Sequence, residues 1–217
     1  PLTAHNEVLV PFFAKKRNAI IELKTKRVNI ERIRKLDSNG RTVVSWSMNT
    51  KRVQREEEHK CASIEERIQA ARKCLEWGYR VGFHFDPLID YDGCLEEYEE
   101  VLEVILNEVP AEKIVWVSFG SLRFMPALKS IMEKRFPKSP LPYSEWIRGV
   151  DGKMRYLKGR RIELYSSLIR RLQELAPRVP VYLCMETEEV WRRAFGEGIN
   201  PNRMVARLDL VCSSVTL

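Results

Sequence analysis

Side chains that can bind ions or move protons follow three apolar runs of the sequence, where each run ends. The three pairs are Ala19–Leu23 with Lys24-Thr25-Lys26, Thr42–Trp46 with Ser47-Met48-Asn49, and Val81–Phe85, which carries His84, with Asp86-Pro87. Runs rich in β-formers that alternate with helix-like stretches predict consecutive parallel strands. The carboxyl ends of such strands meet on one face of an α/β barrel or doubly wound sheet, where these folds bind ligands. We therefore expect a site that combines ammonium, hydroxyl, amide, imidazole and carboxylate groups.

His84 and Asp86 allow two interpretations. Residues two apart in a strand point to the same side, so these two side chains lie together. With Glu186, which ends a later predicted strand, they offer the ligands of a metal-dependent barrel hydrolase or nuclease. The same pair also suits a substrate-lining position or a hydrogen-bonded position in the core, and a single His-x-Asp pattern does not choose between these roles.

A basic stretch interrupts the alternation of strands and helices after Gly149. Met154-Arg155-Tyr156-Leu157 and Arg160-Arg161-Ile162 flank Lys158-Gly159, a pattern that predicts a β-hairpin turning at the glycine. Five cations and two tyrosines, Tyr156 and Tyr165, are interleaved between residues 153 and 165. Cations contact phosphates, and aromatic or guanidinium planes stack on bases, so nucleic acid is one predicted partner. A solvated basic loop before a helix is the other interpretation.

Composition excludes several classes of protein. The 217 residues, 44% hydrophobic and 31% charged, suit one globular domain rather than a disordered chain. No apolar run approaches the ~20 residues that span a bilayer, so no membrane partner is expected. Five scattered cysteines argue against a disulfide framework or a zinc finger and for a reducing, cytoplasmic location. The net charge of +7 is compatible with a polyanionic partner.

The predicted elements describe an α/β fold in one domain over residues 1–217. Strand–helix units occupy residues 1–148, the basic hairpin 149–165, and a helix, a strand and a tail 166–217. The expected strands are Ala19–Thr25, Arg41–Trp46, Arg80–Pro87, Ile114–Phe119 and Pro180–Met185, and the expected helices are His5–Lys16, Asn29–Leu36, the helix that Ser63 caps and Gly78 ends, Leu95–Val109, Met125–Arg135 and Glu188–Phe195. The charged run Lys51–Glu57 is expected to be a solvated loop. Five strands are too few for a closed eight-stranded barrel.

Several motifs in a fixed order resemble one enzyme family. They are Glu22-Leu23-Lys24-Thr25-Lys26, Ser45-Trp46-Ser47-Met48-Asn49, Gly78-Tyr79-Arg80-Val81-Gly82-Phe83-His84-Phe85-Asp86-Pro87, Asp151-Gly152-Lys153-Met154-Arg155-Tyr156, and Tyr182-Leu183-Cys184-Met185-Glu186 with Val190-Trp191. Together they resemble the spore photoproduct lyase-like branch of the radical S-adenosylmethionine enzymes. The resemblance runs from the first residues to about Asp209.

The resemblance implies a fold and a chemistry. Family members have a partial (β/α) barrel, and a Cys-x3-Cys-x2-Cys loop near its start holds a [4Fe–4S] cluster. The cluster cleaves S-adenosylmethionine, and the radical that forms takes hydrogen from the substrate, which for the lyase is a thymine photoproduct in DNA. This chain has no such cysteine loop. We therefore expect the C-terminal part of such an enzyme, which needs the missing N-terminal half of the barrel and which alone holds no cluster and is inactive.

The resemblance also assigns roles to individual residues. Lys26 matches the strand-end lysine near the cofactor carboxylate, and Ser47 matches a cofactor-contacting serine; Asn49 points to the same side as Ser47. Arg160 matches the arginine of an Arg-Tyr pair on the hairpin that wedges DNA. The second position of that pair is Arg161 here, so the spore lesion itself is a weaker expectation.

Three functions remain open at this point. The first is DNA photolesion repair by radical chemistry, with His84, Asp86, Tyr156, Arg160 and Arg161 on the substrate. The second is the metal-dependent hydrolase or nuclease described above. The third is a non-catalytic nucleic-acid-binding module in which the basic hairpin carries the whole function.

Overall fold

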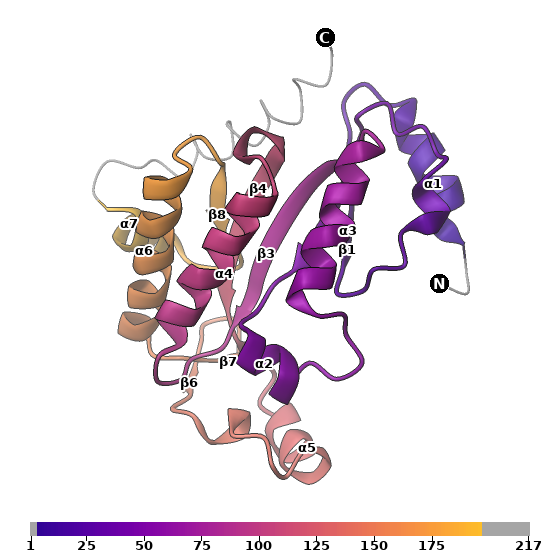
Figure 1. Ribbon diagram of the computed structural model, residues 1–217. Coiled ribbons are helices and arrows are strands. Elements are labelled where there is room, and N and C mark those ends of the chain that lie inside the picture. Colours follow the sequence, from indigo (N-terminus) through magenta and orange to yellow (C-terminus); the bar gives the residue numbers. More distant parts are fainter. Residues whose placement is uncertain (1–3, 197–217) are drawn as a thin grey trace.

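Five parallel strands form the main sheet of the protein, and their order in space is their order along the chain (Figure 1). The structure is a computed structural model and describes residues 4–196. The strands are β1 (Ile21–Thr25), β2 (Thr42–Ser47), β3 (Arg80–Leu88), β4 (Ile114–Ser121) and β8 (Val181–Leu183), in the order β1-β2-β3-β4-β8. The predicted α/β class and all five predicted strands are thus confirmed. The predicted tail, residues 197–217, lies outside the described residues.

Helices cover one face of this sheet. Figure 1 shows α3 (Ile64–Glu76), α4 (Cys94–Glu108) and α6 (Lys158–Leu175) side by side in front of the strands. The predicted capping box starts α3: Ser63 accepts from the backbone N–H of Glu66, and the Glu66 side chain accepts from the backbone N–H of Ser63. The remaining helices are α1 (His5–Ala14), α2 (Lys51–Glu56), α5 (Leu128–Arg135) and α7 (Glu188–Phe195), with 3-10 turns at Glu31–Ile33, Ala111–Lys113 and Leu141–Tyr143.

The hydrophobic core lies between the sheet and these helices. Trp46, Phe83, Phe85 and Phe119 are fully buried there. Burying one such side chain contributes about 1.5–3 kcal/mol, so this layer holds the strands in register. Ile68 and Ala71 of α3 join the same core, which confirms the buried face predicted from their spacing.

A small antiparallel sheet corrects the predicted hairpin. Its strands are β5 (Arg123–Phe124), β6 (Ile147–Arg148) and β7 (Met154–Arg155), in the order β5-β7-β6. The chain turns between β6 and β7 at residues 149–153, where Gly152 has a φ of 77°, a backbone conformation that favours glycine. Lys158 begins α6, so Gly159 lies in a helix, and the hairpin turn predicted at this glycine is wrong.

Two shorter segments also differ from the prediction. The charged run predicted as a loop forms α2, because the Thr50 hydroxyl caps it by accepting from the backbone N–H of Val53 at 3.2 Å. The predicted helix Asn29–Leu36 contains only the 3-10 turn Glu31–Ile33. α2 brings the residues that follow it against the carboxyl ends of β1 and β2.

Candidate active site

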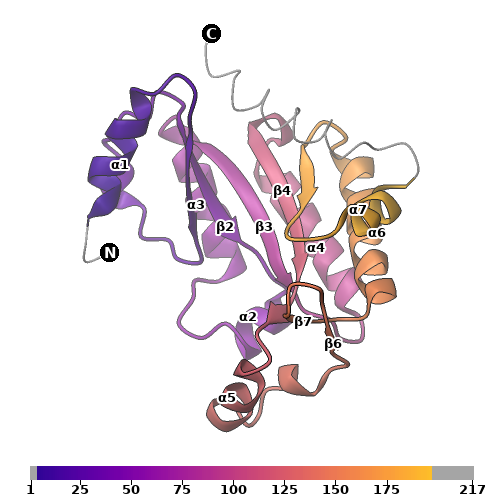
Figure 2. The ribbon, with the colours of Figure 1, turned by 180° about the vertical axis from the view of Figure 1, so that it is seen from behind.

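The two faces of the sheet carry different side chains. The face covered by α3, α4 and α6 is apolar. The opposite face, turned to the viewer in Figure 2, carries a row of polar side chains beside a small apolar cluster of Val43, Val115 and Trp116; we call it the polar face. Its polar side chains on the first four strands include Glu22, Lys24, Ser45, Ser47, His84, Asp86 and Ser118. Side chains two residues apart point to one side of a strand, and the register sets Ser47 beside His84 and His84 beside Ser118. The chemically capable residues therefore meet on this face.

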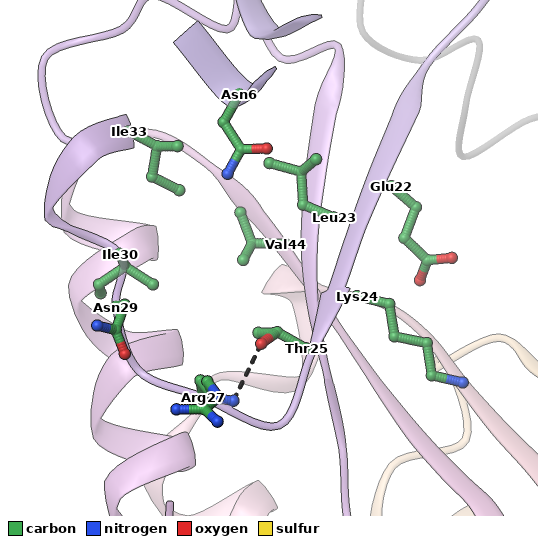
Figure 3. Close-up of a pocket in the computed structure, with 10 residues that line it drawn as sticks. All are labelled: Asn6, Glu22, Leu23, Lys24, Thr25, Arg27, Asn29, Ile30, Ile33 and Val44. Atoms are coloured by element: carbon green, nitrogen blue, oxygen red, sulfur yellow. Dashed lines mark hydrogen bonds between the residues drawn. The ribbon is translucent and has the colours of Figure 1, made fainter. Parts of the chain in front are cut away.

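A cavity of about 790 Å³ lies at the outer edge of β1 (Figure 3). Glu22 and Lys24 project to the opposite side of β1 from Leu23, and all three line this cavity. Ile30, Ile33 and Val44 add an apolar wall. Among residues 4–196, β1 pairs only with β2, so its outer edge is open to another strand.

Lys26, predicted to bind a cofactor, takes part in a network of charged side chains. It lies just after β1 and forms an ion pair with Glu58. Glu58 also accepts a hydrogen bond at 2.5 Å from Arg67, which is fully buried in α3. The other donors of Arg67 reach the backbone oxygens of Ser47, at 2.7 Å, and Ala62, at 3.0 Å. The network joins the carboxyl ends of β1 and β2 to α3.

Asn49 belongs to the same network. Its side-chain N–H groups donate to Glu58 at 3.3 Å and to the backbone oxygen of Pro87 at 3.2 Å, and its oxygen accepts from the Tyr98 hydroxyl at 2.5 Å. Burial alone would raise the pKa of Glu58, but hydrogen bonds and charges from Lys26 and Arg67 outweigh it and lower that pKa. The sequence-predicted residues Lys26 and Asn49 therefore both contact one ionised carboxylate, whereas Ser47 joins this network only through its backbone oxygen.

His84 links two other groups on the polar face. Its Nδ1 lies 2.6 Å from Ser118 Oγ, and its Nε2 lies 2.5 Å from Glu22 Oε1. Burial raises the pKa of Glu22, but the hydrogen bond and charge of His84 outweigh this effect, and the pKa is lowered. An ionised Glu22 carboxylate can only accept, and the Trp116 indole N–H also lies 3.4 Å from His84 Nε2. Glu22, His84 and Ser118 thus form a hydrogen-bonded chain that can hold a proton between a partly exposed carboxylate and a buried hydroxyl.

Asp86 pairs with Arg123 near the carboxyl ends of the strands. The guanidinium donates to both carboxylate oxygens, at 3.0 and 3.4 Å, and Lys24 Nζ lies 3.9 Å from one of them. Arg123 also contacts Cys184 Sγ at 3.3 Å. Burial, and then the negative Asp86, raise the pKa of Cys184, so this thiol keeps its proton at neutral pH. A Cβ at Gly120 would lie 2.7 Å from Asp86 Oδ1, so the pair needs a glycine there.

Arg160 and Arg161, predicted to bind DNA, are both engaged within the protein. Arg160 pairs with Asp90 at 2.8 Å and with Glu163 at 3.0 Å, and 31% of its side chain is exposed. Arg161 is buried and donates to Glu186 at 3.0 Å. Successive helix residues point about 100° apart, so these neighbours in sequence face different partners.

Tyr156, predicted to stack on a base, is only 2% exposed. Its ring already stacks on Trp146, with 4.5 Å between ring centroids, and its hydroxyl accepts from the backbone N–H of Asp90 at 3.2 Å. Trp146 packs edge-on against Phe124 at 4.8 Å. The tyrosine therefore stabilises the small sheet and offers no open face to a base.

The three residues of the metal-site interpretation have separate partners. His84 faces Ser118 and Glu22, Asp86 faces Arg123, and Glu186 accepts from Arg161 and, at 2.8 Å, from the Tyr165 hydroxyl. Within residues 4–196, no three His, Cys, Asp or Glu side chains are grouped so as to hold a metal ion. The geometry gives no support to the metal-dependent hydrolase.

Several site residues escaped sequence reasoning. Arg67 was detectable, because it lies on the apolar stripe of α3 beside Ile64 and Ile68, where a charge requires a buried partner. Glu58 follows a charged run that resembles a solvated loop. Ser118 could be recognised as a partner of His84 only from the pairing of β3 with β4, and Arg123 as a partner of Asp86 only from the position of β5.

Comparison with known proteins identifies the family. The model of the family described as spore photoproduct lyase matches residues 1–179. The chain belongs to this family. It is 30% identical over 139 residues to the spore photoproduct lyase of Clostridium acetobutylicum, covering 64% of this chain and 41% of that protein. It is 26% identical over 165 residues to the enzyme of Bacillus subtilis, covering 72% of this chain and 48% of that protein. The chain thus spans less than half the length of these two curated relatives.

Solved structures of the family share the fold. A spore photoproduct lyase complexed with dinucleoside spore photoproduct aligns with a TM-score of 0.76 and 23% identity, over 84% of this chain and 56% of that one. A variant with bound AdoMet and the same dinucleoside aligns with a TM-score of 0.73 and 23% identity, over 84% of this chain and 55% of that one. The α/β topology described above is therefore the topology of this family.

The described residues contain no helix that is both long and apolar enough to cross a membrane. The cytoplasmic location predicted from the cysteines stays a prediction.

Proposed function

We propose that this chain is the C-terminal part of a radical S-adenosylmethionine lyase that repairs a photolesion in DNA. The observation that carries the proposal is the polar face. It carries His84 and Asp86 on β3, and Lys26 follows β1 at the same end of the parallel sheet, in a chain of the spore photoproduct lyase family. A sheet whose strands follow chain order, with one face under helices and an open edge at β1, suits a segment of a partial barrel. The rest of that barrel would then pair with β1.

The residues at the ends of β1 and β2 fit the cofactor's carboxylate. An ammonium has three donors, and Glu58 engages Lys26 while 32% of the lysine side chain stays exposed. Lys26 would hold the carboxylate, Ser47 would lie at the next strand end, and Asn49 would act by holding Glu58. When bound, the cofactor supplies the radical that takes hydrogen from the substrate.

The four cysteines among the described residues do not fit an iron–sulfur cluster. Cys61, Cys74, Cys94 and Cys184 are all free thiols, and no group of three metal-binding side chains exists within residues 4–196. A [4Fe–4S] cluster requires thiolates that converge on it. We propose that the ligands come from the remaining part of the enzyme.

The substrate would lie against the polar face and the β6–β7 hairpin. His84 and the Asp86–Arg123 pair offer donors and acceptors for a pyrimidine edge. Val150 at the hairpin tip is fully exposed, and the side chains of Arg148 and Lys153 beside it form no ion pair with any described residue. This hairpin takes over the DNA-contacting role that the sequence suggested for Arg160, Arg161 and Tyr156.

Titration of the chain with dinucleoside spore photoproduct, followed by NMR chemical shifts, tests the proposal. We expect saturable binding that exceeds binding of the undamaged dinucleotide and that weakens in Arg123→Gln. Arg72→Gln, which removes an exposed guanidinium from α3, serves as the matched control and should leave binding unchanged. Equal binding of damaged and undamaged dinucleotides, or equal effects of both variants, would refute a lesion site on the polar face.

A further inference from the structure

Many cations of this protein pair with carboxylates, and the described cations without such a pair are scattered, but four of them lie close together in one segment. Arg155, Lys158, Arg160 and Arg161, which make the sequence around residue 158 so basic, all pair with carboxylates within 4.0 Å. In contrast, four cations of residues 125–138 have no such partner among the described residues: Lys129, Lys134, Arg135 and Lys138. We call residues 125–138 the basic arm.

The basic arm is not needed for the hydrophobic core. Its helix α5 buries no residue, and all four cations are exposed. Glu133 is the one carboxylate among residues 125–138. Lys134 and Arg135 stabilise the carboxyl end of α5 through the helix dipole, but Lys129 in the first turn and Lys138 after the helix gain nothing from it. The charge of the arm therefore lacks a structural explanation within the fold.

The position of the basic arm relates it to the site. Both ribbon views place α5 beyond the carboxyl ends of the strands, next to α2 and below the small sheet (Figures 1 and 2). The Ser139 hydroxyl donates to Glu57 at 2.9 Å, and Phe136 stacks on His59 with 6.0 Å between ring centroids. These contacts fix the arm to the segment that carries Glu58. Its cations thus project from the end of the molecule where the polar face and the hairpin tip lie.

We infer that the basic arm binds the phosphate backbone of the DNA duplex that flanks the lesion. This inference rests on the proposed function and adds a second contact to it, separate from the hairpin. A row of unpaired, solvated cations is the usual footprint of phosphate binding, which is independent of base sequence. Exposed Leu128 and Ile131 lie on the same helix, and a protein partner for them is the competing outcome of the test.

Fluorescence anisotropy of the full chain with a short undamaged duplex, at several salt concentrations, tests the inference. The arm variant replaces Lys129, Lys134, Arg135 and Lys138 with Gln. We expect the slope of log K against log salt to fall by about 0.9 for each phosphate that the variant no longer neutralises, and affinity near physiological salt to fall at least ~10-fold. The control variant replaces four exposed, unpaired cations near the amino ends of the strands with Gln: Lys15, Arg17, Lys35 and Lys113. It should keep most of the affinity and slope.

Each result decides the question. Equal losses in the arm and control variants would overturn the inference, because general charge would then explain binding. Loss in Arg148→Gln/Lys153→Gln with none in the arm variant would also overturn it, while leaving the proposed hairpin contact intact. No loss in either variant would remove both DNA contacts. If Leu128→Ser/Ile131→Ser changes the oligomeric state while the arm cations leave DNA affinity unchanged, the arm docks protein and the inference fails.

Discussion

Replacing Glu58 with Gln should destabilise this protein far more than replacing a typical surface glutamate. Glu58 keeps only 6% of its side chain exposed, and Arg67, its partner at 2.5 Å, has none exposed. The change preserves side-chain volume, but the neutral amide leaves the buried Arg67 charge without a negative partner. Removing one partner of a buried pair in this way costs about 3–5 kcal/mol. Urea unfolding at neutral pH, followed by circular dichroism, measures the loss.

A matched control separates this effect from general loss of charge. Glu65→Gln lies on the same helix as Arg67, but the pair of Glu65 with Lys51 is exposed on both sides, 54% and 75%, so the change should cost at most about 1 kcal/mol. Glu58→Gln/Arg67→Leu should cost less than the sum of the two single changes, because the second change removes the unpaired charge. Glu58→Gln within ~0.5 kcal/mol of wild type would refute the account.

The pH dependence of unfolding provides an independent check on Glu58. Its pKa is lower in the folded protein than in the unfolded chain. Its contribution to stability is therefore complete above the unfolded value of about 4.3, and is lost as the pH falls through the folded value. The difference in unfolding free energy between wild type and Glu58→Gln should shrink in that acidic window. A constant difference down to the acid transition would contradict the ionised network.

Three further outcomes are expected. His84→Gln should raise the pKa of Glu22, since burial then acts with less opposition; a carboxyl carbon NMR titration measures it, and an unchanged value would contradict the linkage. Gly120→Ala should destabilise the protein by about 1–3 kcal/mol and displace Asp86, because the added methyl would overlap that carboxylate; calorimetry that shows no loss would refute the close approach. The chain alone should assemble no [4Fe–4S] cluster on anaerobic reconstitution, and a stable cluster absorbance would overturn the proposal that the ligands lie elsewhere.

The fold was predictable because each strand is a continuous apolar run between turn residues. The observed strand ends lie within two residues of most predicted ends, and the capping box marked the start of α3 correctly. The small sheet was not predictable in this way, because a strand of two residues carries no periodic signal. The start of α6 was detectable, since Ile162, Tyr165, Ile169 and Leu172 already recur at helical spacing. Gly159, near that start, was interpreted as a turn, so the predicted hairpin lies several residues after the observed one between β6 and β7.

The candidate site was predictable only in part, because neighbours in space are not neighbours in sequence. The structure places Lys26, Asn49, His84 and Asp86 at or just after strand ends, as the sequence predicted, and their roles stay predictions. Their partners come from elsewhere: Glu58 follows α2, Ser118 lies on β4, and Arg123 begins β5. A lone Lys or Asp at a strand end carries no signal for the charge that will neutralise it.

The same limit applies to the net charge of +7 and to the basic stretch from residue 153 to 161, because a sequence does not show which cations are paired within the fold. A count of cations gives equal weight to a buried, paired guanidinium and a free ammonium, yet only the free group can release counterions when it meets a phosphate. Arg161, with 6% of its side chain exposed, would have to break its ion pair with Glu186 before it could bind a phosphate. Lys129 and Lys138 break no ion pair when they bind, because no carboxylate of the described residues pairs with them. The proposed DNA contacts should therefore depend on the unpaired cations, and the stability of the fold on the paired ones.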